Sequence, residues 1–128
     1  MENQLKAIQD TGKRSFGRGA VVDDKTLIDA LVPCADSWGE SARLNRTVIE
    51  AFENAAKAAA EGARRTEEII AQMGRAGTVG ERSIGYPDAG AYALGVIFTE
   101  IYEELRFKLF FIRLIVTYIK SYIYFRIG

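Results

Sequence analysis

Apolar residues recur every three or four positions over much of the chain, which is the spacing of one face of an α-helix. The clearest stretch is 46–73, and it predicts one long helix ended by Gly74. Its repeating positions are Val48, Phe52, Ala55, Ala59, Gly62, Thr66, Ile70 and Met73. The middle of this stripe is made of alanine and glycine, which lets a neighbouring helix approach closely. The pattern therefore predicts a tight helical bundle.

Weaker patterns predict further helices on either side of this stretch. A short helix is expected over 3–10, and another begins after Asp23 or Asp24, either of which is placed to cap it. Pro33 should kink that helix or end it early. Asp88 is the expected N-cap of a last helix that continues to residue 105. Because no segment of 1–105 alternates as a strand does, we expect an all-α fold.

A glycine-rich loop, residues 74–85, carries the most suggestive chemistry. It holds Arg75 and Arg82 and is followed at once by the helix start at 88–90. Arginines on a flexible loop beside free helix N–H groups are the components of a phosphate site. The alternative is a surface loop whose arginines pair with neighbouring carboxylates. The glycine spacing matches neither a Walker A loop nor a dinucleotide-binding loop.

Composition excludes several kinds of site. The 128 residues include no histidine and one cysteine, which rules out a Cys/His zinc site, a disulfide scaffold and Ser-His-Asp catalysis. Asp24 and Asp29 are poorly aligned on one helical face for a magnesium ion, so we interpret them as cap and solvated face. Without a histidine to activate it, Cys34 is expected to be a packed side chain. We therefore name no catalytic residue and no metal ligand.

The net charge of zero hides an uneven distribution. Residues 1–105 hold 12 basic and 17 acidic side chains, a net charge of −5, whereas the tail, residues 106–128, holds five basic side chains and no acidic one. Half of the aromatic residues also lie in this tail. We therefore divide the chain into an N-terminal helix and basic loop (1–17), a helical body (18–105) and a cationic aromatic tail (106–128).

Two interpretations of the tail remain open. In the first it contacts a membrane surface or a partner, although its longest uncharged apolar run, 114–119, is too short to span a bilayer. In the second, which we favour, it is non-native sequence, because its β-branched and aromatic clusters show no clean helical face. The N-terminus has no signal-peptide pattern, so a cytoplasmic protein is expected. Nucleic acid is not among the expected partners.

Two motifs resemble a known family. The glycine loop Gly74-Arg-Ala-x-x-x-Gly-Glu-Arg-Ser-Ile-Gly, with Asp88-x-Gly90 after it, resembles the C-terminal signature of the nucleotide-binding (L) subunit or domain of dihydroxyacetone kinases. The segment Arg18-Gly-Ala-Val-Val-Asp-Asp-Lys-Thr-Leu-Ile-Asp-Ala-Leu-Val-Pro33 is similar to that family's Gly-Asp-Lys-Thr-Met-x-Asp helix start. The resemblance covers residues from about 18 to 105.

The resemblance implies a fold and a set of site residues. The family's domain is an eight-helix barrel that binds nucleotide at one end, and this chain resembles its second part. Phosphoryl transfer goes to dihydroxyacetone held on a histidine of a separate subunit or domain. By similarity, Gly19 and Leu27 would line the adenine and ribose side, and Arg75 would contact the phosphates. The pocket would be closed by Asp88, Ala89 and Gly90.

The resemblance also implies what this chain lacks. The family's Gly-Asp-x-Asp motif, which binds two magnesium ions, and its Gly-Ala-Ser-Gly phosphate loop are absent. We therefore expect ADP or ATP as the ligand, Mg²⁺ ligands supplied from elsewhere, and negligible turnover by this chain alone. Expected partners are the dihydroxyacetone-binding subunit and, as phosphoryl donor, a phosphocarrier protein where ATP is not used. The alternative function is a non-catalytic helical remnant or interaction module that binds a complementary chain.

Overall fold

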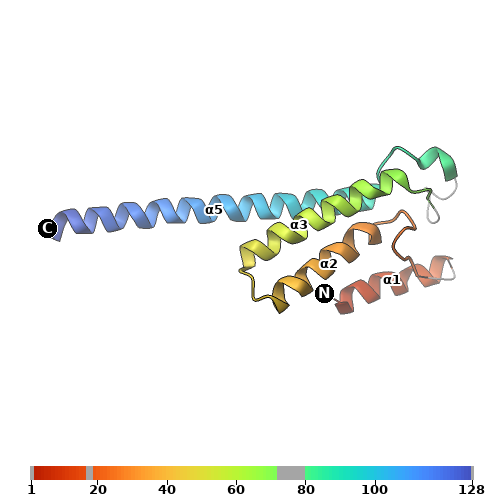
Figure 1. The fold of residues 1–128 in the computed structure, drawn as a ribbon, viewed down its shortest axis with the longest axis horizontal. Coiled ribbons are helices and arrows are strands. Elements are labelled where there is room, and N and C mark those ends of the chain that lie inside the picture. The colour runs from red at the N-terminus through yellow and green to blue at the C-terminus, as the bar shows by residue number, and fades with distance from the viewer. Residues whose placement is uncertain (1, 17–18, 72–79, 128) are drawn as a thin grey trace.

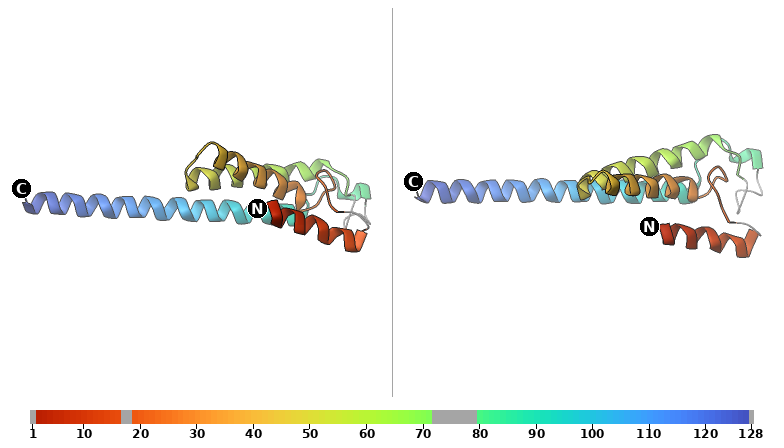
Figure 2. Two further views of the ribbon diagram at one scale, coloured as in Figure 1. Left: turned by 90° about the horizontal axis from the view of Figure 1, so that it is seen from below. Right: turned by 60° about the horizontal axis from the view of Figure 1, so that its bottom comes forward.

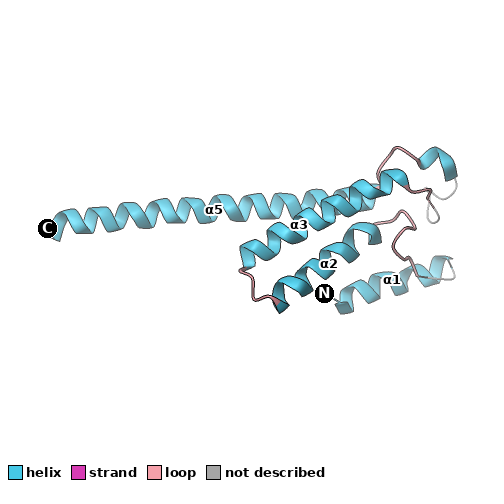
Figure 3. Cartoon of the chain, viewed as in Figure 1, coloured by secondary structure: helices cyan, strands magenta, loops and turns pink. Residues whose placement is uncertain are grey.

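The computed structural model describes residues 2–16, 19–71 and 80–127, and within these ranges it is all-α with no strand (Figures 1 and 3). The elements in chain order are α1 (Glu2–Phe16), α2 (Ile28–Arg43), α3 (Val48–Arg65), the 3₁₀ turns η1 (Thr66–Glu68) and η2 (Gly80–Ser83), and α5 (Ala89–Ile127). The predicted all-α fold is confirmed. Helix α3 runs antiparallel to both α2 and α5, and α1 lies beside α2 (Figures 1 and 2).

Small side chains hold α2, α3 and α5 together, as the alanine stripe predicted. The buried core consists mainly of alanines with Ile28 and Cys34. A Cβ atom on Gly62 would lie 2.2 Å from the carbonyl oxygen of Asp29, and one on Gly95 would lie 3.2 Å from Cα of Ala60. The helix backbones therefore touch directly at these glycines. Burial raises the pKa of the Cys34 thiol to about 11, which suits the packing role expected for it.

The long helix expected over 46–73 is shorter in the structure. Helix α3 ends at Arg65, and η1 leads into extended backbone at Ile69. The reason is Thr66, whose hydroxyl donates to the carbonyl oxygen of Ala63 and accepts the backbone N–H of Asp88 at 2.8 Å. This contact fastens the end of α3 to the start of α5. The predicted terminator Gly74 lies outside the described residues.

The start of α2 also differs from the prediction. The helix begins at Ile28, and neither Asp23 nor Asp24 caps it. Pro33 does not end it early, since α2 continues to Arg43. Proline removes the amide that would normally pair with the carbonyl of Asp29, and that carbonyl faces Gly62 of α3. Because Gly62 has no side chain, α3 can pack closely against the turn of α2 in which Pro33 leaves the Asp29 carbonyl without its usual donor.

Helix α5 runs without interruption through the predicted boundary at 105/106 and extends far beyond the other helices (Figure 1). Every residue from Arg106 to Ile127 is exposed. Within the described ranges, no helix combines the length and the apolar character needed to cross a membrane.

Candidate functional site

The two segments that carry the motifs meet at one end of the bundle. The side chain of Lys25 is buried at 2% exposure, and its ammonium group donates to the carbonyl oxygen of Ser83. The hydroxyl of Ser83 in turn accepts the backbone N–H of Ala71 at 3.0 Å. The chain before α2, the chain after α3 and the turn before α5 are therefore joined by two hydrogen bonds.

Carboxylates shape the segment before α2. Asp29 accepts the backbone N–H of Asp23 on Oδ1 at 2.6 Å and that of Thr26 on Oδ2 at 2.7 Å. Asp24 accepts the N–H of Val21 at 2.9 Å. These contacts stabilise left-handed backbone at Asp23 and Lys25, with φ of 74° and 59°. The aspartates expected to cap or to face solvent instead fold the loop that places Leu27.

The start of α5 is built as the sequence predicted. Asp88 accepts the backbone N–H of Ala91 at 2.8 Å, so it is the N-cap. The amides of Ala89 and Gly90, the first two residues of the helix, have no acceptor within the helix itself. They carry the positive end of the helix dipole and are the groups suited to an anion.

Four of the predicted site residues lie together here: Leu27, Asp88, Ala89 and Gly90. A Cβ atom on Gly90 would lie 3.1 Å from Cβ of Leu27 and 3.2 Å from Oδ2 of Asp88. Leu27 is 36% exposed and Ala89 and Gly90 are exposed, so the surface they form is open. Residues more than 60 positions apart in sequence thus form one apolar and amide-lined patch, which we call the Leu27–Gly90 patch.

A fifth predicted residue, Gly19, contacts a different element. Gly19 lies against α1, where an added Cβ atom would be 2.7 Å from the carbonyl oxygen of Gln9. The side-chain amide of Gln9 also donates to the carbonyl of Ala20 at 3.2 Å. The glycine is therefore required for packing against α1, whatever else it does. Arg75 lies outside the described residues.

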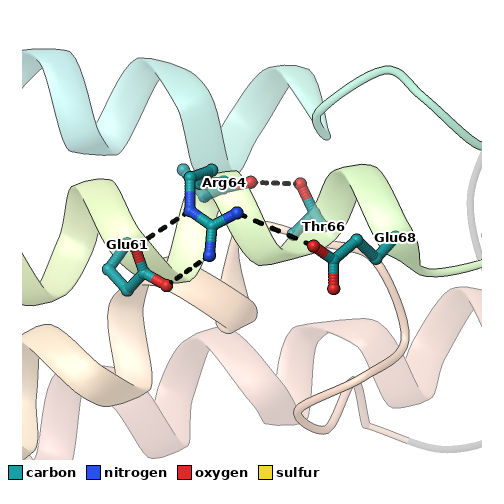
Figure 4. Close-up of polar contacts among 5 residues, drawn as sticks. Glu61, Arg64, Thr66 and Glu68 are labelled. Atoms are coloured by element: carbon teal, nitrogen blue, oxygen red, sulfur yellow. Dashed lines mark hydrogen bonds and ion pairs between the residues drawn. The ribbon is translucent and has the colours of Figure 1, made fainter.

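Ion pairs fix the turn at the end of α3 (Figure 4). Arg64 forms a two-pronged contact with Glu61, at 2.7 and 3.0 Å, and lies 3.6 Å from Glu68. The hydrogen bonds raise the pKa of Arg64 and lower that of Glu61. Beside them a groove of about 300 Å³ runs between α3 and α5, lined by residues that include Ala60, Tyr92 and Val96. The groove does not include the Leu27–Gly90 patch.

The described residues form no cluster of metal-binding side chains. Among them, no three carboxylate or thiol side chains gather closely enough to hold a metal. Asp24 and Asp29 direct oxygens to backbone amides instead. The donor set therefore does not fit the metal that the resemblance implies.

Sequence reasoning missed the residues that hold the patch in place. These residues are Lys25 and Thr66. Lys25 gives no signal in the sequence, because its partner is a backbone carbonyl 58 residues away. For Thr66 no signal in the sequence indicates a partner 22 residues away.

Comparison with known proteins gives a consistent result. The sequence model of the DAK2 domain family matches residues 1–103. The chain is 38% identical over 82 residues to an L-erythrulose kinase of Pectobacterium atrosepticum, covering 64% of this chain and 14% of that protein. It is 37% identical over 92 residues to the ADP-binding subunit DhaL of the PEP-dependent dihydroxyacetone kinase of Escherichia coli, covering 71% of this chain and 44% of that subunit.

A second ADP-binding subunit gives similar coverage. Subunit DhaL of the PEP-dependent dihydroxyacetone kinase 2 of Listeria innocua is 34% identical over 104 residues, which are 81% of this chain and 45% of the subunit. The chain therefore spans less than half the length of these relatives. The tail lies beyond the residues that the family model matches.

Proposed function

Because this chain belongs to the DAK2 domain family, we propose that it is the nucleotide-binding part of a dihydroxyacetone kinase-type phosphotransferase. Its ligand is ADP or ATP, and the phosphoryl acceptor is dihydroxyacetone held by a partner subunit. The observation that carries the proposal is the Leu27–Gly90 patch, in which an apolar side chain lies beside free amides at a helix N-terminus. The naming of two similar proteins as ADP-binding subunits supports the same ligand.

Each residue of the proposed site has a role that follows from its chemistry. Leu27 offers an apolar surface for the base and ribose. The amides of Ala89 and Gly90 donate to the diphosphate, and the guanidinium of Arg75 pairs with it. Asp88 acts indirectly, because its carboxylate caps α5 and keeps the first turn in place. Gly19, which packs against α1, is the second residue that we propose for the base side by similarity to the family.

Phosphoryl transfer requires more than these residues supply. Such reactions depend on positioning and on neutralising the phosphate charge, and the described residues hold no metal site. We therefore propose that the metal ligands come from a complementary chain and that the acceptor is bound by the dihydroxyacetone-binding subunit. The donor is ATP itself or a phosphocarrier protein that phosphorylates bound ADP.

Isothermal titration of the full chain with Mg-ADP tests the nucleotide site. We expect Arg75→Ala and Gly90→Val to weaken binding by about tenfold or more, the first by loss of a phosphate contact and the second by a side chain against Leu27. Arg43→Ala is the matched control, because Arg43 is exposed at the other end of α2. Equal affinity in all four proteins would contradict the proposed site. Circular dichroism of each variant checks that the fold is retained.

A further inference from the structure

The outer part of α5, residues 106–127, is a mainly apolar helix that meets another described element only near its start, where Ile49 of α3 lies close to Phe107 and Phe110. All of its residues are exposed, and it projects beyond the body of the protein (Figure 1). Soluble proteins seldom leave so long an apolar surface in water, and helices with so much apolar surface are normally covered. Some other surface must therefore cover this segment.

Polar side chains of this segment form a narrow stripe along a helix that is otherwise mainly apolar. Arg113, Thr117, Lys120 and Tyr124 follow one another at steps of four, three and four residues, so they form one stripe. The other side is formed by large exposed side chains: Phe111, Ile112, Ile115, Ile119, Tyr122 and Ile123. The cations Arg113 and Lys120 thus share one stripe, whereas Lys108 and Arg126 lie among the apolar side chains.

The charge of the segment favours one kind of covering surface. Arg106 and Lys108 pair with Glu103 and Glu104 at 4.0 and 3.5 Å, but no carboxylate follows them along the helix. Arg113, Lys120 and Arg126 therefore face solvent as uncompensated cations. Two such segments packed together would bring like charges close, which disfavours a second copy of the tail. A surface that carries negative charge can pair with these cations, and it can cover the apolar residues if it also accepts apolar side chains.

We propose that residues 106–127 lie on the surface of an anionic phospholipid bilayer. The isoleucine side enters the boundary between headgroups and acyl chains, and Arg113 and Lys120 remain among the phosphate groups. Arg126, at the end of the apolar side, reaches the headgroups with its long side chain.

Flotation of the full chain with lipid vesicles tests this proposal, because bound protein rises with the vesicles whereas aggregated protein sinks. We expect the protein to float with vesicles of phosphatidylcholine and phosphatidylserine, and to remain below vesicles of phosphatidylcholine alone. Arg113→Gln and Lys120→Gln should each lower the partition coefficient about fivefold, and high salt should lower it further.

Matched variants separate the two sides of the helix. Ile115→Gln with Ile119→Gln should lower the partition coefficient about tenfold or more, because apolar surface is lost at unchanged charge. Thr117→Gln with Ser121→Gln, on the polar side, should leave it unchanged. Equal losses in the two pairs, or equal flotation with neutral vesicles, would overturn the proposal. Sedimentation without lipid gives a further test. If the wild type formed oligomers and the Ile115→Gln, Ile119→Gln variant were monomeric, a second copy would cover the helix and the proposal would be overturned.

Discussion

Lys25 shows how one buried charge organises the candidate site. The residue lies in left-handed backbone with φ of 59° and is 2% exposed, two features that cost free energy in a lysine. The hydrogen bond to Ser83, 58 residues further along the chain, offsets part of that cost and holds the segment before α2 against the turn before α5. Leu27 reaches Gly90 because these two segments are tied together.

Replacing Lys25 should therefore destabilise the protein. We expect Lys25→Met to lower the free energy of unfolding by about 1–3 kcal/mol, because the carbonyl of Ser83 loses its charged donor while the aliphatic stem is kept. Lys57→Met is the control, since Lys57 is exposed and pairs only at the surface with Glu53. Urea denaturation of the three proteins measures the difference. Identical urea midpoints for the wild type and Lys25→Met would show that the Lys25–Ser83 hydrogen bond does not contribute to stability.

At the scale of elements, close contact between helices depends on glycine. The backbone of α3 at Gly62 lies against the carbonyl of Asp29 in α2, and Gly95 brings α5 against Ala60. These contacts allow a core made largely of alanine, whose small side chains fill only a narrow space. Gly62 thus determines where α3 packs against α2, and Gly95 determines where α5 packs against α3.

Two glycine substitutions should have opposite effects. We expect Gly62→Ala to lower the free energy of unfolding by about 2 kcal/mol or more, because the new Cβ atom would lie 2.2 Å from the carbonyl oxygen of Asp29. Gly39→Ala, in the interior of α2 with no atom within 4 Å of the added carbon, should raise it by up to about 1 kcal/mol. Thermal melting compares both with the wild type, and a tolerated Gly62→Ala would contradict the close contact.

The start of α3 gives a pH-dependent prediction. Thr47 and Glu50 form a capping box, in which Glu50 accepts the backbone N–H of Thr47 at 2.8 Å and its hydroxyl at 2.9 Å. These hydrogen bonds lower the pKa of Glu50 below its ordinary value of 4.5. The folded state therefore binds a proton less readily than the unfolded state. The stabilisation is present above pH 4.5 and is lost as the pH falls through the folded pKa.

Thr47→Val removes the hydroxyl and should expose this dependence. We expect the variant to lose about 1 kcal/mol of stability at pH 7 and less at an acidic pH below the folded pKa of Glu50, where the protonated carboxyl is a weaker acceptor. Thr47→Ser, which keeps the hydroxyl, serves as the control. Chemical denaturation at the two pH values measures the difference, and an effect of equal size at both would contradict the role of the Glu50 carboxylate.

At the scale of the whole molecule, α5 joins two separate surfaces. Its first turn carries the proposed nucleotide contacts, and residues 106–127 form the proposed lipid-binding segment (Figure 1). The two proposed sites therefore lie at opposite ends of one helix. A ligand at one end and a bilayer at the other do not compete for the same residues.

The absence of a metal site among the described residues leads to an expectation for activity. Mixed with Mg-ATP and dihydroxyacetone, the full chain should form no dihydroxyacetone phosphate above the uncatalysed background, because no described residue neutralises the phosphate charge as a metal would. A coupled enzymatic assay for the product measures this. Turnover by the chain alone would show that metal ligands are present outside the described residues.

The sequence by itself determined the all-α class, the family and the alanine stripe of α3, because helical periodicity and motif residues are local properties. It also determined the cap of α5, since Asp88 and the N–H of Ala91 are three residues apart. Only the tertiary structure decided that α3 stops at Arg65. The helix ends there because the hydroxyl of the next residue, Thr66, accepts the backbone N–H of Asp88. The same holds for the neighbours Leu27 and Gly90 and for the burial of Lys25. Partners far apart in sequence leave no periodic signal, so these features depend on how the helices pack.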